Sequence, residues 1–146
     1  MDRTDDFMAM LTRLRSDVDE LQRLSASRWG SKRGSWHNVG DVGEPAFQNS
    51  WVNRGGTTRP ARFRLDGDVV RLEGAVSTGT NGTTIFTLPA GYRPTAEVVI
   101  PIRLNDGGVE FVAYLFVQSS GAVSPNAAGT SGGITAVDFF VTFTVT

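Results

Sequence analysis

The side chains that most often perform catalysis are sparse in this sequence. The chain has one histidine, His37, one lysine, Lys32, and no cysteine. A nucleophilic site needs a base within hydrogen-bond range of a serine or cysteine, and the neighbours of His37 form no known motif of that kind. No glycine-rich phosphate loop accompanies Lys32, so nucleotide chemistry has no support. We therefore predict that the protein is not an enzyme and carries no cofactor.

Carboxylates offer a second kind of chemistry, because a pair can hydrolyse glycosides and a cluster can bind calcium. The glycine-containing part of the chain has these candidates: Asp66, Asp68, Glu73, Glu97, Asp106, Glu110 and Asp138. Three lie beside glycines in turns, where aspartate forms local hydrogen bonds, and the others alternate with apolar residues. The favoured interpretation places them in turns and on strand faces, with calcium at the Asp66–Asp68 turn as an alternative. We predict no metal site within one chain.

Two tryptophans and the histidine lie in or beside a polar, glycine- and serine-rich stretch. Trp29, Trp36 and His37 are these residues, and nothing in the local sequence explains the large rings. Indoles need an apolar cover, so burial against a neighbouring subunit or another protein is favoured, and a platform for sugar rings is the alternative. His37 is predicted to be a surface or interface residue. A ligand shared by three copies of His37 around an axis is a further alternative.

The overall charge excludes some partners. The 14 basic and 15 acidic residues give a net charge of −1, which creates no field that would attract nucleic acid or an anionic membrane. No apolar run approaches the roughly 20 residues of a membrane span, and the first residues lack the features of a signal peptide. The sequence predicts a soluble protein made in the cytoplasm, with no nucleic-acid partner and no membrane insertion.

Residues 1–28 are predicted to form a helix with one apolar stripe. The stripe has alternating spacings of four and three residues, the heptad pattern of a coiled coil: Phe7, Leu11, Leu14, Val18 and Leu21. A helix of about 22 residues is marginal alone in water and needs a partner. A short parallel coiled coil of identical chains is favoured, and packing on the chain's own globular part is the alternative. Residues 29–45 are predicted to be a polar connector.

The rest of the chain alternates apolar and polar residues with period two. This pattern predicts strands at 47–52, 61–66, 69–76, 84–88, 96–104, 109–117 and 137–146. Turn residues separate them, and 121–133 is predicted to be loop. Short strands at these spacings, without a second helix, indicate a mainly β fold, an antiparallel β-sandwich or jelly roll over residues 46–146.

Two segments resemble the tip domains of tailed-phage fibre and minor tail proteins. Residues 44–53 read EPAFQNSWVN, and the likeness continues through 61–74. Residues 85–94 read IFTLPAGYRP, which is similar to an element common in those tips. The resemblance spans about residues 44–104 and implies a trimeric β-structure that binds host surfaces. The family fixes no set of binding residues.

The resemblance implies a trimeric virion protein of the tail or capsid surface, made in the host cytoplasm. Its N-terminal helix would attach it to other tail or capsid proteins, and its β domain would bind a host receptor, with a glycan as the expected class. The alternative is a structural decoration of the capsid or tail without a dedicated receptor.

A receptor site is expected on loops, because rigid β scaffolds carry recognition on their connections. The predicted loops are 78–83, 105–108 and 119–133. The candidate binding residues are Asn105, Asp106, Asn126, Tyr114 and Arg103.

Overall fold

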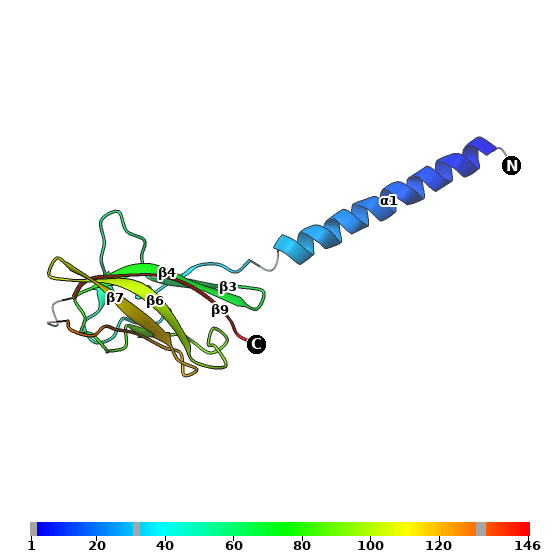
Figure 1. Cartoon of the computed structure of the whole chain (residues 1–146). Coiled ribbons are helices and arrows are strands. Elements are labelled where there is room, and N and C mark those ends of the chain that lie inside the picture. Colours follow the sequence, from blue (N-terminus) through cyan, green and yellow to red (C-terminus); the bar gives the residue numbers. More distant parts are fainter. Residues whose placement is uncertain (1–2, 31–32, 131–133) are drawn as a thin grey trace. The chain divides into compact units, whose positions relative to one another are not determined.

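The chain forms two compact units, residues 1–33 and residues 34–146. The structure is a computed structural model that describes residues 3–30, 33–130 and 134–146 (Figure 1). The first unit is a helix and the second is built of β-strands. No described helix is both long enough and apolar enough to cross a membrane.

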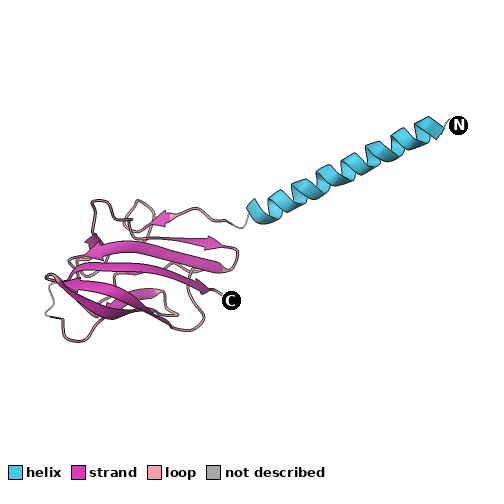
Figure 2. Ribbon diagram, turned by 45° about the horizontal axis from the view of Figure 1, so that its top comes forward, coloured by secondary structure: helices cyan, strands magenta, loops and turns pink. Residues whose placement is uncertain are grey.

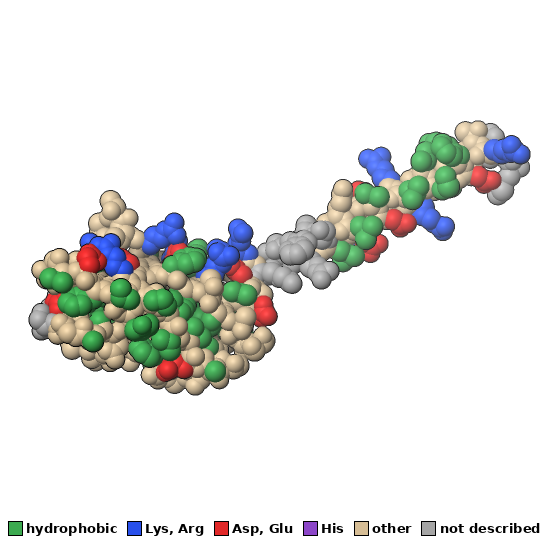
Figure 3. All heavy atoms as spheres, viewed as in Figure 1, with side chains coloured by type: hydrophobic (Ala, Val, Ile, Leu, Met, Phe, Trp, Pro, Cys, Tyr) green, Lys and Arg blue, Asp and Glu red, His purple; other side chains and the backbone are tan. Residues whose placement is uncertain are grey.

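The first unit contains α1, which runs from Arg3 to Gly30. The helix is longer than the predicted 22 or so residues, because the backbone stays helical after the apolar stripe ends at Leu21. No proline or glycine interrupts it before Gly30. The five stripe residues, Phe7, Leu11, Leu14, Val18 and Leu21, are 43% to 66% exposed. Figure 3 shows hydrophobic side chains at the surface of this helix.

The second unit is one antiparallel sheet (Figure 2). Its described strands are β1 (His37–Asn38), β2 (Val52–Asn53), β3 (Arg62–Asp66), β4 (Val69–Ser77), β5 (Phe86–Thr87), β6 (Val98–Asp106), β7 (Val109–Val117), β8 (Ala122–Asn126) and β9 (Ile134–Thr144). Their order is β1-β3-β4-β9-β6-β7-β8-β5, and β2 pairs with β4 off this path. An eight-residue ladder joins β4 to β9, so the last strand lies in the middle of the sheet.

The sheet curls over and encloses a core. Phe63 in β3 and Phe86 in β5 belong to strands near opposite ends of the strand order, yet their rings stack with centroids 6.2 Å apart. Alternate residues point into this core, and in β9 they are at most 7% exposed: Val137, Phe139, Val141 and Phe143. The prediction of a mainly antiparallel, sandwich-like β fold after an N-terminal helix is confirmed.

Three short strands differ from their predicted limits. The segment predicted as a strand at 47–52 contains only the start of β2, because the backbone is not extended at Asn49 and Ser50, whose φ angles are +53° and +65°. At 84–88 only the two residues of β5 are strand. The predicted loop at 121–133 contains β8, in which Pro125 pairs with Leu115. β5 pairs with only two residues of β8, and Pro125 is not one of them. Proline therefore needs no N–H to donate to β5 at this position.

The predicted connector at 29–45 differs most from the structure, because its second half belongs to the β unit. β1 pairs with β3, and His37 stacks on the Phe63 ring with centroids 5.3 Å apart. His37 Nδ1 lies 2.8 Å from Glu44 Oε1, and its Nε2 lies 3.0 Å from the hydroxyl of Tyr92. Both ring nitrogens therefore have partners in the same chain. The His37 side chain is 32% exposed, so it lies partly at the surface, and its two contacts within the chain disfavour a ligand shared at an axis.

The tryptophans are covered within the chain where the structure describes them. The Trp36 ring has the guanidinium carbons of Arg62 and Arg64 at 4.2 Å and 4.5 Å from its centroid. Trp51 is 1% exposed and donates its indole N–H to Thr83. No neighbouring subunit is needed to explain these two rings. Trp29 lies in α1, and its side chain is outside the described residues.

A chain that begins at Gly34 is expected to keep the β circular-dichroism spectrum and a cooperative thermal transition. A chain that begins at Gly43 loses β1, the His37 contacts and Val39, which is 2% exposed. The lost burial and hydrogen bonds should lower the free energy of unfolding by about 3 kcal/mol or more. Urea denaturation of the two chains measures this difference, and equal midpoints would contradict it.

Candidate functional site

One face of β9, β6 and β7 points away from the core and carries both polar and exposed apolar side chains. Arg103 pairs across the sheet with Val112 on one side and Asp138 on the other, and Pro101 pairs with Tyr114. Residues paired in this way share a face. We call this the outer face, and its members are Pro101, Arg103, Asn105, Glu110, Val112, Tyr114, Asp138 and Phe140.

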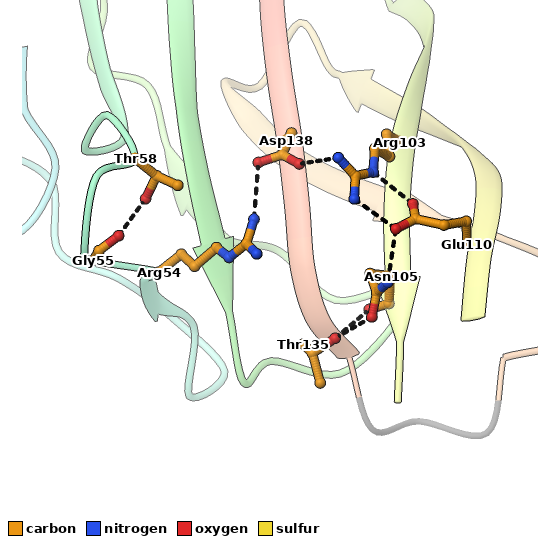
Figure 4. A network of polar contacts seen from close by, with 8 residues as sticks. All are labelled: Arg54, Gly55, Thr58, Arg103, Asn105, Glu110, Thr135 and Asp138. Atoms are coloured by element: carbon orange, nitrogen blue, oxygen red, sulfur yellow. Dashed lines mark hydrogen bonds and ion pairs between the residues drawn. The ribbon is translucent and has the colours of Figure 1, made fainter. Parts of the chain in front are cut away.

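A network of polar contacts fixes the side chains at the centre of the outer face (Figure 4). Arg103 donates two hydrogen bonds, from Nε and Nη2, to the two oxygens of Glu110. Asn105 donates to the same carboxylate at 2.8 Å, and its own oxygen accepts from the hydroxyl of Thr135. The planar guanidinium is thus held in one orientation before any ligand arrives.

Asp138 lies between two arginines in the same network. Its oxygens are 3.8 Å from Arg54 Nη1 and 3.9 Å from Arg103 Nη1. Both distances fit ion pairs and exceed a hydrogen bond, and the Asp138 side chain is 34% exposed. The carboxylate is therefore held by charge while its oxygens keep the capacity to accept hydrogen bonds.

Hydrogen bonding from Arg103, and then from Asn105, lowers the pKa of Glu110 from an ordinary value of 4.5 to about 2. The same contact with Glu110 raises the pKa of Arg103. Because the folded pKa of Glu110 is depressed, the pair's contribution to stability is complete above pH 4.5 and disappears as the pH falls toward 2. The charged pair therefore persists through mildly acidic conditions.

Carbon NMR of the Glu110 carboxyl is expected to titrate with a midpoint near pH 2. Arg103→Ala removes the largest cause and should move the midpoint toward 4.5, the ordinary value. Asn105→Ala should move it in the same direction by less. A midpoint near 4.5 in the unmodified protein would contradict this prediction.

The structure brings four of the five predicted binding residues together. Arg103, Asn105 and Tyr114 belong to the outer face, and Asn126 shares this face because it pairs with Tyr114 across the β7–β8 ladder. Asp106 differs, because it is only 6% exposed. The sequence Asn-Asp-Gly-Gly reads as an open turn, but Asp106 still belongs to β6 and pairs with Ile134. It is therefore not accessible to a receptor.

Two of the three predicted loops are joined by direct contacts. The side chain of Asn81 both donates to the carbonyl of Ala127 and accepts from its amide N–H, at 2.7 Å and 3.0 Å. The Thr78 amide donates to the carbonyl of Ile134. Ile134 is the β9 partner of Asp106, at the base of the remaining predicted loop, 105–108. Residues 131–133 of the predicted loop 119–133 lie outside the described residues.

The sequence-based prediction does not include several members of the outer face. Val112 is 77% exposed and Phe140 is 60% exposed, and Asp138 is predicted only to be a carboxylate on a strand face, without a role in binding. Phe140 has a signal in the sequence, because it places an aromatic ring on the polar side of the last strand. The sequence gives no signal for Arg54, because folding alone brings it close to Asp138, which lies far away along the chain.

These groups can make noncovalent contacts with a ligand. Oriented guanidinium, carboxylate and amide groups form directional hydrogen bonds, and exposed aromatic rings pack on apolar surfaces. Beside Arg103 the surface is hollowed by an open pocket of about 430 Å³, which is lined by Pro101, Ile102, Arg103, Glu110, Phe111 and Val112. Among the described residues, no group of three His, Asp or Glu side chains is placed to hold a metal ion.

Comparison with known proteins finds similar structures but no similar sequence family. No protein-family model matches the sequence, and no curated protein matches it. Among solved structures, the receptor binding protein (gp15) of Listeria phage PSA has a similar fold, with a TM-score of 0.60 and 16% identity. The likeness covers 97% of this chain and 87% of that chain. The resemblance to phage receptor-binding proteins is therefore confirmed as a likeness of fold.

Proposed function

We propose that this chain is a receptor-binding protein of a tailed phage, and that the outer face of its β unit binds a glycan on the host surface. The observation that carries the proposal is the likeness of fold to a phage receptor binding protein over 97% of this chain. The outer face adds support, because Arg103, Asn105 and Tyr114 are positioned there with exposed surface. A binding role needs no catalytic group.

We further propose that three chains associate through α1 and that the same helix attaches the protein to other tail proteins. The support is the heptad spacing of its apolar stripe. Three β units on one stem would bind a repetitive surface with an avidity greater than that of one unit.

Competition with phage adsorption tests the proposed function. Purified protein should bind host cells and block adsorption of the phage that carries it. The double variant Arg103→Ala, Tyr114→Ala should lose both effects with its melting temperature almost unchanged, because both side chains are exposed. Arg71→Ala is the matched control, since it removes an exposed arginine of β4 that pairs with Asp66 instead.

Two results would contradict the receptor-binding proposal. The first is a protein that fails to bind host cells and fails to block adsorption. The second is its location on the capsid of intact particles by immunogold labelling, which would favour the structural decoration.

A further inference from the structure

A second open pocket, of about 440 Å³, lies on the β4 side of β9. The lining that matters for binding consists of Thr58, Arg59, Glu73, Asp138 and Phe140. The residues come from the connection between β2 and β3, from β4 and from β9. The volume falls in the range of small-ligand sites, about 300 to 1,000 Å³.

Phe140 forms an apolar wall of this pocket and is 60% exposed. It pairs with Glu73 of β4 on one side. On its other side the described β6–β9 ladder ends at Arg103 and Asp138, so no β6 residue is paired with Phe140 there. Burying the ring under a stacked ligand would remove apolar surface from water, which favours binding.

The polar groups of the pocket are held in place, and Arg59 and Asp138 can still form further hydrogen bonds. Glu73 is 4% exposed and accepts hydrogen bonds from Arg59 at 2.9 Å and from Arg62 at 2.8 Å and 2.6 Å. This contact orients Arg59, whose side chain is 69% exposed and keeps further N–H donors. Asp138 supplies acceptors, because its two arginine neighbours lie beyond hydrogen-bond distance.

The segment that borders the pocket is held at both ends. The Arg54 amide donates to the carbonyl of Ala75, and the Ala75 amide donates to the carbonyl of Arg59, at 2.9 Å and 3.1 Å. Between these ends the Thr58 hydroxyl donates to the Gly55 carbonyl at 2.6 Å. A preformed pocket loses less entropy when it binds a ligand.

The charges around the pocket favour a neutral ligand. Both carboxylates of the lining already lie beside arginines of the same chain, Glu73 beside Arg59 and Arg62 and Asp138 beside Arg54 and Arg103. A charged group of either sign would have to compete with these ion pairs. An uncharged ligand rich in hydroxyls would not.

We propose that this pocket is a saccharide subsite that binds one uncharged sugar ring. The apolar face of the ring stacks on Phe140, and its hydroxyls donate to Asp138 and accept from Arg59. The inference rests on the proposed function and deepens it, because it names a second contact region and the charge class of the glycan unit.

Ligand-observed and protein-observed NMR on the full chain tests the subsite. The probes are the neutral sugars glucose, galactose, rhamnose and N-acetylglucosamine, with glucosamine and glucuronic acid as charged counterparts. At least one neutral sugar should bind with a dissociation constant of about 1 mM and shift the amide resonances around Phe140. The charged counterparts should bind more weakly.

Two variants make the test specific. Phe140→Ala should weaken binding by about tenfold or more, with little change in melting temperature because the ring is exposed. Val109→Ala is the control, since it truncates an apolar side chain of similar exposure, 58%, that lies outside both pocket linings and is not a member of the outer face. Neutral-sugar binding that survives Phe140→Ala, tighter binding of a charged sugar, or no binding of any neutral sugar would overturn the proposal.

Host-cell binding separates this inference from the proposed function. If Phe140→Ala binds cells normally while Arg103→Ala, Tyr114→Ala does not, the receptor-binding function stands and the subsite is wrong. If the unmodified chain binds a neutral sugar through Phe140 but does not bind host cells, the subsite stands and the proposed function is wrong.

Discussion

Gly79→Ala is expected to lower the free energy of unfolding of the β unit by about 3–5 kcal/mol. A Cβ at position 79 would fall far inside van der Waals contact of the Trp51 indole, against its Cδ2 and Cε2 atoms. Trp51 is 1% exposed and its indole N–H is bonded to Thr83, so the ring has no space into which it can shift. The added methyl group must expel the indole from the core.

Thermal denaturation of a double-mutant cycle isolates this contact. Gly79→Ala should cost little when Trp51 is already alanine, so the two changes should be strongly non-additive. Gly82→Ala is the control, because a Cβ there meets nothing within 4 Å and costs only the strain of its φ of +80°. Its destabilisation should be about 1–2 kcal/mol. Additive effects of Gly79→Ala and Trp51→Ala would show that the clash with the indole does not decide the cost.

The long strands of the fold are predictable because each has a complete alternating pattern of its own. The predicted strand at 69–76 is β4, Val69–Ser77, and the predicted strand at 109–117 has the limits of β7. The strand predicted at 47–52 misplaces Trp51, because the position of this ring depends on Gly79, which forms the other wall of its site. A local pattern contains no information about such a partner.

The candidate site is only partly predictable for a related reason. Arg103 and Tyr114 could be proposed together because a short turn joins their two strands, which makes them neighbours in an antiparallel hairpin. Asp138 and Phe140 join them only because β9 inserts between β4 and β6, and the sequence does not specify that strand order. The pocket beside Phe140 also needs the segment after β2, which no periodic pattern connects to β9.

Leu14→Glu is expected to dissociate the proposed trimer. Leu14 is the third of the five residues of the heptad stripe, where three copies would meet at the axis. Three glutamates in one buried layer would combine desolvation with like-charge repulsion, so the associated state should be lost. Light scattering should give about three times the chain mass of 15.7 kDa for the unmodified protein and that mass itself for the variant.

Dissociation should reduce binding to host cells by about 10²- to 10⁴-fold, because three linked sites would then act singly. Binding of a free neutral sugar to the β unit should stay unchanged, since α1 contributes no residue to either pocket. Ser16→Glu is the matched control, because it places the same charge on an exposed position of α1 outside the stripe. If the unmodified chain scatters as a monomer, association through α1 is wrong. A dimer would keep the coiled coil and remove the threefold arrangement, and an unchanged cell affinity in a monomeric Leu14→Glu variant would mean that one β unit is sufficient for attachment.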